Sequence, residues 1–287
     1  MSQNGLKTAF VFAGGGSLGA VQVGMLQEVI KEGIQADFVV GSSVGALNAA
    51  YYASMPDMEG IARLAKIWRT LRRSDIFPVN LSGIVRLLRR RDHLIDPSSL
   101  RRIIERHIPY TNLEDAEIPV HVIATNVGGV SVKLSSGPAV EAILASAAIP
   151  VIFPAVRIGN DELVDAAVGS NTPIVSAAEL GASRLIVFPT GFGCALKGPP
   201  RGPVSSGLHA ITLLIAHQTV RDLRHLMGKV DISTVPALCP LAVSPTDFSN
   251  TGDLIERAAQ NTRAWIDEGG LSRQEVPASL IAHTHPH

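Results

Sequence analysis

A serine flanked by two glycines is the first group in this sequence that could do chemistry. Ser43 forms the pattern G-x-S-x-G with Gly41 and Gly45. The hydrophobic residues 38–40 predict a strand before it, and the alanine-rich residues 43–54 predict a helix after it. A tight strand-to-helix turn raises a serine hydroxyl above the sheet edge and sets it at the positive end of the helix dipole. The pattern therefore predicts a nucleophilic serine for acyl transfer.

A run of three glycines lies ahead of this motif. Gly14, Gly15 and Gly16 follow the hydrophobic residues 7–13, which predict a buried strand, and precede residues 18–32, which have helical periodicity. Successive glycines at the start of a helix can direct several N–H groups at one anionic oxygen. A plain strand-to-helix turn does not require three glycines in a row. Because both glycine motifs follow strands that should be parallel neighbours, we expect this run to form an oxyanion hole.

The glycine run also fits a nucleotide-binding pattern. Gly14, Gly16 and Gly19 match G-x-G-x-x-G, which can hold a dinucleotide pyrophosphate. That site needs an acidic residue at the C-terminal end of the next strand. Asp37 has about the right separation, but it precedes the strand, and Ser43 follows the strand's end. The oxyanion hole is therefore favoured, with nucleotide binding as the alternative.

A serine nucleophile needs a group that accepts its proton. Of the nine histidines, none clearly follows a strand, and His209, His217 and His225 drift around one predicted helix at intervals of eight residues. Asp165 directly follows the hydrophobic residues 163–164 and precedes small residues, so its carboxylate could reach a neighbouring loop. Asp165 is therefore the favoured base. Helix capping or turn formation is the alternative role for an aspartate in this position.

Composition and charge narrow the functional class. The chain has 287 residues, 46% of them hydrophobic and 17% charged, which suits one large core. The formal net charge is zero, which argues against a protein that coats nucleic acid. Residues 55–110, however, hold twelve Arg and Lys against six acidic residues. This predicted helical segment could cap a cleft and contact an anionic phospholipid surface, or it could be an ion-paired helical face in solvent.

Cysteine use and the N-terminus bear on location. Cys194 and Cys239 are the only cysteines, too few for a disulfide framework and without metal-ligand spacing. They are expected to be reduced thiols of a cytosolic protein. The N-terminal residues do not have the pattern of a signal peptide. We expect a cytoplasmic location with at most peripheral membrane contact, and no metal or cofactor.

The order of predicted elements indicates an α/β fold. Two strand–turn–helix units in the first fifty or so residues predict right-handed crossovers and a parallel sheet. Glycine turns at 128–129 and 159–160 predict two hairpins. We expect one domain over residues 1–287, a three-layer α/β/α fold with a mainly parallel central sheet. Its predicted parts are a core over about 6–190, a helical cap-like segment over about 56–110, a loop over 191–207, C-terminal helices over about 207–270 and a disordered tail over about 273–287.

Four motifs in this order resemble the signature of the patatin-like phospholipase family. They are the glycine run with residues 17–19, the motif of Ser43, the segment 145–150 (ASAAIP) with 153–154, and Asp165 with the two alanines after it. The resemblance covers about residues 6–190. It implies a Ser43–Asp165 dyad without histidine, an oxyanion hole from the glycine-run N–H groups, and hydrolysis of phospholipid or other fatty-acyl esters.

One residue departs from that signature. The family usually has glycine directly after the aspartate, and this chain has Ala166. A methyl group narrows the allowed backbone conformations, so we expect a slightly shifted Asp165 or low activity. Two alternatives stay open: a histidine-dependent esterase, and a non-catalytic lipid-binding or regulatory protein on the same scaffold.

Overall fold

An eight-stranded mixed sheet forms the centre of the computed structural model, which describes residues 7–78, 93–169, 172–198, 200–283 and 285. The strand order is β5-β6-β3-β2-β1-β7-β8, and β4 pairs with β3. The pairings among β3, β2, β1, β7 and β8 are parallel, and those of β3 with β4, β3 with β6 and β5 with β6 are antiparallel. The strands are β1 (Thr8–Phe12), β2 (Phe38–Ser42), β3 (Val120–Asn126), β4 (Ser131–Leu134), β5 (Val156–Ile158), β6 (Asp161–Val164), β7 (Arg184–Phe188) and β8 (Asp231–Thr234).

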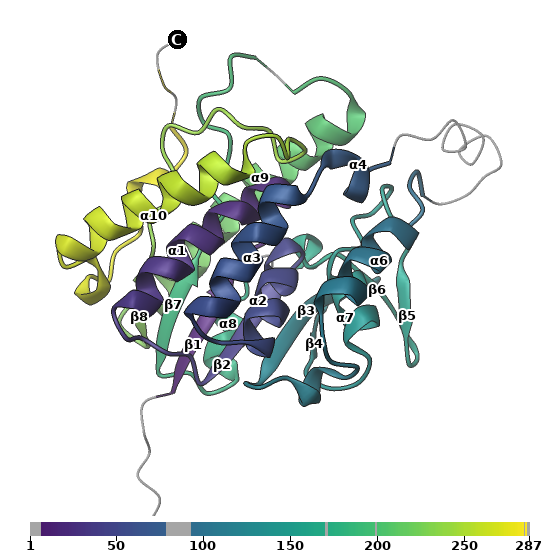
Figure 1. The fold of residues 1–287 in the computed structure, drawn as a ribbon, viewed down its shortest axis with the longest axis horizontal. Helices are drawn as coiled ribbons and strands as arrows, with labels where there is room; N and C mark the ends of the chain where they lie inside the picture. Colours follow the sequence, from purple (N-terminus) through teal and green to yellow (C-terminus); the bar gives the residue numbers. More distant parts are fainter. Residues whose placement is uncertain (1–6, 79–92, 170–171, 199, 284, 286–287) are drawn as a thin grey trace, which may run out of the picture.

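Helices cover both faces of this sheet (Figure 1). Helices α1, α2, α3 and α10 lie side by side on one face, and α8 and α9 pack on the other. The α-helices are α1 (Ala20–Lys31), α2 (Val44–Ser54), α3 (Met58–Thr70), α4 (Arg73–Ile76), α6 (Ser98–His107), α7 (Ala139–Ser146), α8 (Ile174–Glu179), α9 (Pro203–Leu226) and α10 (Thr251–Asp267). The 3₁₀ helices are η1 (Gly16–Gly19), η2 (Leu113–Asp115), η3 (Ala166–Val168), η4 (Gly270–Ser272) and η5 (Ala278–Leu280).

The two-residue period of the strands divides the core between these layers. On β1, Phe10 and Phe12 point into the hydrophobic cluster under α1, α2 and α3, whereas Ala9 and Val11 point into the cluster under α8 and α9. All four side chains are fully buried. A strand buried on both faces explains why residues 8–12 are continuously hydrophobic. The α/β fold with a largely parallel central sheet is thereby confirmed.

Strand β3 changes partners along one of its edges. Strand β4 pairs with Val122–Thr125 of β3, so β2 and β6 must share the opposite edge. The pairing with β2 ends where Ser42 meets Ile123, and the pairing with β6 begins where Val164 meets Thr125. Since β2 and β6 approach this point from opposite directions, the residues that follow each strand converge beside β3.

Most predicted elements are present, with differences at three places. Both glycine hairpins form, as β3–β4 and β5–β6. Strand β8 was missed because its sequence, DIST, carries no hydrophobic run. Helix α9 begins at Pro203, inside the predicted loop 191–207, because a proline at the first helical position suits a helix start. Within the part of the chain that the structure describes, no helix combines the length and hydrophobicity needed to cross a bilayer.

Part of the segment 273–287, predicted as a disordered tail, packs against the rest of the domain among the described residues. Residues 278–280 form η5, and Leu280 is only 2% exposed. Leu280 and Val276 pack against the cluster under α8 and α9. Burial of these hydrophobic side chains stabilises the position of this segment against the domain. Part of the predicted cap, residues 79–92, lies outside the described residues.

Candidate active site

A strained turn presents Ser43 between β2 and α2. Ser43 has φ 53° and ψ −126°, which places a non-glycine residue in the left-handed half of backbone space. A Cβ on Gly41 would lie 2.3 Å from the carbonyl oxygen of Gly45, and a Cβ on Gly45 would lie 2.3 Å from that of Phe12. Both flanking glycines are therefore required by close backbone approach, as expected for a nucleophile elbow.

Ser43 and Asp165 form a buried hydrogen-bonded pair. The Ser43 hydroxyl donates to Oδ2 of Asp165 at 2.7 Å, and the backbone N–H of Ala167 donates to Oδ1 at 2.7 Å. Asp165 is 1% exposed and Ser43 is 7% exposed. Burial raises the pKa of Asp165 to about 6, although the hydrogen bonds from Ala167 and Ser43 act in the opposite direction. The pair thus joins a hydroxyl to a carboxylate that is more basic than an ordinary aspartate.

Ala166 fits at the position where a glycine was expected. It begins the 3₁₀ helix η3, and its φ is not in the left-handed region that favours glycine. Its methyl group is completely buried and packs in the cluster under α8 and α9. The carboxylate of Asp165 still reaches Ser43. Alanine at this position is therefore compatible with the hydrogen bond between Ser43 and Asp165.

The glycine run is held from two sides by loops that follow other strands. The Thr190 hydroxyl, after β7, donates to the carbonyl oxygen of Gly14 at 2.6 Å. The backbone N–H of Ser17 donates to the carbonyl oxygen of Pro245, after β8, at 2.8 Å. Gly16 has φ 60°, and a Cβ there would lie 2.4 Å from the same Pro245 oxygen. Two tight contacts thus set the conformation of the run.

The N–H groups of this run have no backbone partner in the described part of the chain. Among the described residues, no backbone hydrogen bond is donated by Gly14, Gly15 or Gly16. Gly16 and Ser43 line the same cavity. Gly14 and Gly15 are buried and do not line it.

A buried hydrogen-bond chain behind the site was not anticipated from the sequence. Gln22 donates to the carbonyl oxygens of Ala13 and Phe188, and Asn48 donates to Gln22 Oε1 at 2.7 Å. The indole N–H of Trp68 donates to Asn48 Oδ1 at 2.9 Å. Each residue lies on a different helix, so this chain links α1, α2 and α3 behind the two glycine motifs. Polar residues on otherwise hydrophobic helix faces were the signal in the sequence.

Ser146 is a further residue that sequence reasoning missed, although it lies in the motif at 145–150. Its hydroxyl accepts a hydrogen bond from the Ser43 backbone N–H at 2.7 Å and donates one to the carbonyl oxygen of Ile123. Ser146 is fully buried. It therefore joins the elbow to β3.

A hydrophobic cavity opens from Ser43 between α2, α3, α4 and α6. Its few polar or glycine members are Gly16, Ser43, Asn48, Tyr51, Trp68 and His107. The hydrophobic residues that line it are Val44, Leu47, Leu64, Ile67, Leu71, Ile76, Phe77, Leu100, Ile103, Ile104, Ile108, Ala147, Ile149, Phe153 and Phe248. The described residues of the predicted cap, about 56–110, thus supply much of one wall of this cavity.

The histidines named from the sequence lie elsewhere. His217 and His225 are exposed on α9, His209 is half-buried there, and none of the three lines the cavity. His107, on α6, does line it, and burial together with Arg106 lowers its pKa. No described histidine hydrogen-bonds to Ser43, whose hydroxyl is directed at Asp165.

Asp37 lies at the wrong end of the strands for a nucleotide site. Its Oδ2 accepts a hydrogen bond from the Thr8 backbone N–H at 2.7 Å, at the start of β1. The glycine run follows the opposite end of β1. The second anchor of a dinucleotide is therefore not beside the glycine run.

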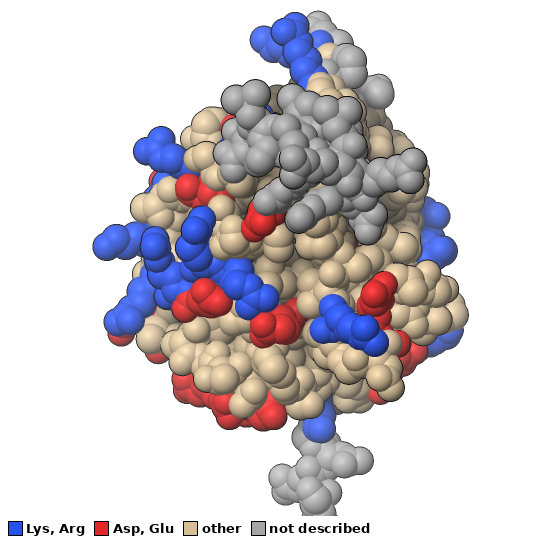
Figure 2. Space-filling view, turned by 90° about the vertical axis from the view of Figure 1, so that its right-hand side faces the viewer, with Lys and Arg blue, Asp and Glu red and all other residues tan. Residues whose placement is uncertain are grey.

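The basic segment is partly ion-paired. Arg63 pairs with Glu59, Arg69 with Glu256 at 3.3 Å, and Arg101 with Glu141 at 2.9 Å. Figure 2 shows a face on which Lys and Arg side chains gather toward one side, with acidic side chains among them. Four of the segment's arginines (Arg86, Arg89, Arg90 and Arg91) lie outside the described residues.

Several known proteins resemble this chain in sequence. A protein of Caenorhabditis elegans named as patatin-like phospholipase domain-containing is 27% identical over 185 residues, covering 63% of this chain and 16% of that protein. Lysophospholipase NTE1 of Cryptococcus neoformans is 27% identical over 199 residues, covering 65% and 11%. An NTE family protein of Mycobacterium tuberculosis is 26% identical over 235 residues, covering 81% and 60%. The chain thus spans 60% or less of the length of each.

Solved structures with a similar arrangement include VipD of Legionella pneumophila, at 12% identity and a TM-score of 0.46, covering 92% of this chain and 67% of that one. Human GIVD cytosolic phospholipase A2 in complex with methyl gamma-linolenyl fluorophosphonate has 13% identity and a TM-score of 0.44, covering 94% and 59%. The sequence profile of the family described as patatin-like phospholipase matches residues 10–178, more than half of the chain. The chain belongs to the patatin-like phospholipase family.

Proposed function

We propose that this protein hydrolyses the carboxylic esters of lipids through a dyad of Ser43 and Asp165. The observation that carries the proposal is the 2.7 Å hydrogen bond to Asp165 from the hydroxyl of Ser43, a residue that lines a hydrophobic cavity. Membership of a phospholipase family supports the general class of lipid acyl hydrolase. The dyad, the oxyanion hole and the serine-ester mechanism are inferred from the geometry.

In the first half-reaction, Ser43 Oγ attacks the ester carbonyl carbon while Asp165 accepts the hydroxyl proton. The tetrahedral intermediate then breaks its bond to the alcohol oxygen, and Asp165 returns the proton to that leaving group. The acyl group remains on Ser43. In the second half-reaction, Asp165 accepts a proton from water, the water oxygen attacks the acyl carbon, and Ser43 Oγ leaves and regains the proton. Fatty acid and alcohol are released.

The proposed oxyanion hole consists of the N–H groups of Gly14, Gly15 and Gly16. Val44, which follows the nucleophile at the start of α2, offers the donor that such elbows commonly contribute. A preorganised donor of this kind contributes about 3 kcal/mol to transition-state stabilisation. This matters because a carboxylate is a weak base for a hydroxyl, even with its pKa raised to about 6. The glycine run is therefore as important to the proposed reaction as the base.

The hydrophobic cavity supports a fatty-acyl chain as the acyl part of the substrate. Leu64, Ile104 and Phe153 line it together with Ser43. Each methylene moved from water into such a lining contributes about 0.8 kcal/mol. A polar headgroup would find few hydrogen-bonding partners there. We therefore assign the acyl chain, and not the headgroup, to this cavity.

The test uses a fluorophosphonate probe and p-nitrophenyl esters of graded chain length. We expect the probe to label the wild-type protein at Ser43, and Ser43→Ala to abolish both labelling and ester hydrolysis. Asp165→Asn should lower hydrolysis at least a hundredfold. His225→Ala, on the exposed face of α9, is the matched surface control.

Two sets of results would contradict the dyad. Full activity of Ser43→Ala or Asp165→Asn would refute it. Loss of ester hydrolysis in His107→Gln, with hydrolysis kept in Asp165→Asn, would establish a histidine-dependent esterase instead. A folded wild-type protein that neither takes the probe nor cleaves any ester would support a non-catalytic role.

We further propose that the basic segment contacts anionic phospholipid surfaces. Arg72 and Arg73 lie in the helical segment that walls the cavity, and each well-placed arginine contributes about 1 kcal/mol near such a surface. Co-sedimentation with vesicles should require anionic lipid and should weaken at high salt. Binding that is indifferent to both would contradict the proposal.

A further inference from the structure

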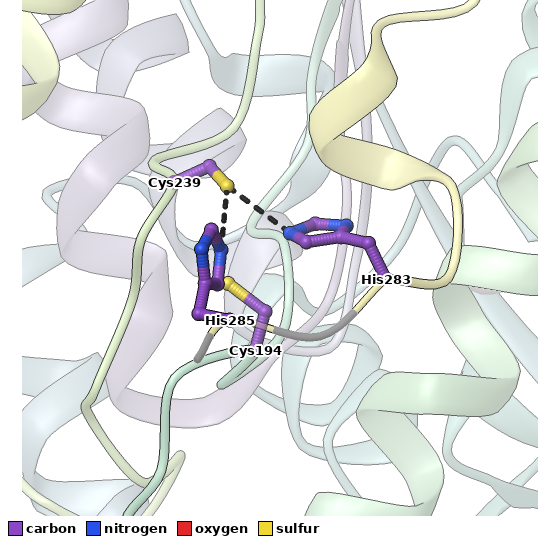
Figure 3. A group of neighbouring side chains, drawn as sticks. All are labelled: Cys194, Cys239, His283 and His285. Atoms are coloured by element: carbon purple, nitrogen blue, oxygen red, sulfur yellow. Dashed lines mark hydrogen bonds between the residues drawn. The ribbon is translucent and has the colours of Figure 1, made fainter. Parts of the chain in front are cut away.

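Both cysteines of the chain lie beside two histidines (Figure 3), and none of the four residues lines the cavity at Ser43. Cys194 lies in the segment after β7, Cys239 in the segment after β8, and His283 and His285 near the C-terminus. One donor atom from each residue can be chosen so that all four lie within 4.8 Å of one another. Three distant parts of the sequence thus bring two sulfur and two nitrogen donors to one point.

The spacing of these donors is close to that of a tetrahedral metal site. Cys239 Sγ lies 3.1 Å from Nε2 of His283 and 3.1 Å from Nε2 of His285. Zinc bonds of about 2.3 Å to sulfur and about 2.0 Å to nitrogen place tetrahedral ligand atoms roughly 3.5 Å apart. The two contacts to Cys239 are a few tenths of an ångström shorter than this, and all four donor atoms lie within 4.8 Å of one another. Side-chain shifts of about 1 Å would therefore admit the ion.

Hydrogen bonds from neighbouring backbone groups favour the metal-binding form of two donors, His283 and Cys194. Nδ1 of His283 lies 2.6 Å from the carbonyl oxygen of Ile281, and since a carbonyl only accepts, Nδ1 carries the proton. In the neutral imidazole, Nε2 then presents its lone pair toward Cys239. The backbone N–H of Leu241 donates to Cys194 Sγ at 3.3 Å, a contact that stabilises a thiolate. Such outer contacts are typical of metal ligands.

We propose that Cys194, Cys239, His283 and His285 bind one Zn²⁺ ion in a closed structural site. Two thiolates and two imidazoles suit zinc, whereas calcium and magnesium prefer oxygen donors. Four protein ligands leave no position for a catalytic water, so the role is structural. The proposal is independent of the proposed esterase reaction.

The position of the site suggests what the ion stabilises. Cys194 lies four residues after Thr190, whose hydroxyl donates a hydrogen bond to the Gly14 carbonyl oxygen. Cys239 lies six residues before Pro245, whose carbonyl oxygen accepts one from the Ser17 N–H. The segments that carry the cysteines also hydrogen-bond directly, from the Ala195 N–H to the Leu241 carbonyl oxygen at 3.0 Å. Zinc would therefore link the two loops, after β7 and after β8, that hydrogen-bond to the glycine run and to Ser17. It would also link the C-terminal segment with His283 and His285 to these loops.

The experiment measures metal content in full-length protein that carries no histidine tag. The protein is reduced, stripped with a chelator, reloaded with zinc sulfate, desalted and analysed by elemental mass spectrometry. We expect about one zinc per chain, a Tm several degrees above that of the stripped protein, and, on substitution with Co²⁺, the visible spectrum of a tetrahedral thiolate site. Zinc binding should also slow amide hydrogen exchange in residues 13–18. This measurement tests whether zinc stabilises the loops around the glycine run, and it needs no activity assay.

Four variants and a control locate the site. Cys194→Ser, Cys239→Ser, His283→Ala and His285→Ala should each lower bound zinc at least tenfold, whereas His225→Ala should keep it. His285 lies outside any helix or strand, so its variant tests the site even where a cysteine variant misfolds. The proposal is overturned by reduced wild-type protein that retains no zinc, by zinc that survives His283→Ala and His285→Ala, or by two thiols that form a disulfide and show no affinity for zinc when reduced.

Discussion

The Ser43 hydroxyl lies 2.7 Å from Oδ2 of Asp165, although 122 positions separate the two residues in the sequence. The edge of β3 explains this proximity. Strand β2 leaves that edge at Ile123 and β6 joins it at Thr125, so the residue after each strand arrives beside the same point of β3. Nucleophile and base are thus positioned by backbone pairing within the sheet.

The first prediction concerns the pH dependence of ester hydrolysis. Asp165 must be ionised to accept a proton, and its pKa in the folded protein is about 6. We expect kcat/KM for a short-chain ester to be constant above pH 7 and to fall about tenfold per pH unit well below pH 6. Initial rates between pH 4.5 and 8.5 check this. A profile that stays flat down to pH 4.5 would contradict Asp165 as the base.

The second prediction concerns stability. The pKa of Asp165 rises from 3.8 to about 6 on folding, so the folded state binds the proton more tightly. Its contribution is most favourable below pH 3.8 and is lost as the pH rises through 6, a difference of about 3 kcal/mol. Asp165→Asn should therefore be more stable than wild type at pH 8, with the gap closing toward pH 4. Urea unfolding of both proteins at several pH values measures this, with exposed Asp161→Asn as control; parallel pH curves for wild type and Asp165→Asn would refute it.

The third prediction tests the turn at Ser43. A Cβ on Gly45 would lie 2.3 Å from the Phe12 carbonyl oxygen and 2.6 Å from that of Ala13, and neither backbone atom can yield easily. Gly45→Ala should lose about 1–3 kcal/mol of stability and most fluorophosphonate labelling. In Gly207→Ala, on α9, the added methyl meets nothing within 4 Å, so labelling should be unchanged. Equal labelling of both variants would show that the turn tolerates a side chain.

The fourth prediction assigns Ser146 as a positioning residue. Ser146→Ala leaves the buried N–H of Ser43 without its partner, at a cost of about 1–3 kcal/mol. We expect a lower kcat with little change in KM, because the nucleophile is displaced while the cavity is unaltered. Ser54→Ala, which removes only a local hydrogen bond to the Tyr51 carbonyl, is the control. A change confined to thermal stability, with kcat intact, would leave Ser146 with a purely structural role.

The fifth prediction concerns chain length. Leu100, on α6, lines the cavity, whereas the dyad lies on other elements. Leu100→Trp should shorten the longest acyl chain that is cleaved efficiently and should leave hydrolysis of the acetate ester nearly unchanged. Leu214→Trp, at an exposed position of α9, controls for the added indole. An unchanged chain-length profile would remove the cavity from substrate binding.

Short-range sequence signals predicted the elements around the site well. The glycine run and the motif of Ser43 both follow strands and precede helices, because these transitions depend on residues close together in the chain. The two hairpins formed at their predicted glycines for the same reason. Strand β8 escaped prediction because its place beside β7 is determined by pairing and not by its own hydrophobicity.

Longer-range relationships came only from the tertiary structure. The sequence does not reveal that Ala166 begins a 3₁₀ helix, where a methyl group is tolerated. The tail was predicted to be disordered because terminal residues often are, yet Leu280 packs in a hydrophobic cluster formed by distant strands and helices. Cys194 and Cys239 were set aside as metal ligands because their spacing is long, whereas packing brings them to His283 and His285.

The sequence by itself determined the class of fold, the turn that bears Ser43, the glycine run and the choice of Asp165 as candidate base. Each depends on local residue types, whose backbone preferences act over a few positions. Tertiary structure decided the 2.7 Å approach of serine and aspartate, the hydrophobic cavity beside them and the meeting of two cysteines with two histidines. These three features depend on which strands pair and which side chains pack together. Such contacts join residues that are far apart in the chain, and no local sequence pattern shows that they will be close in the folded protein.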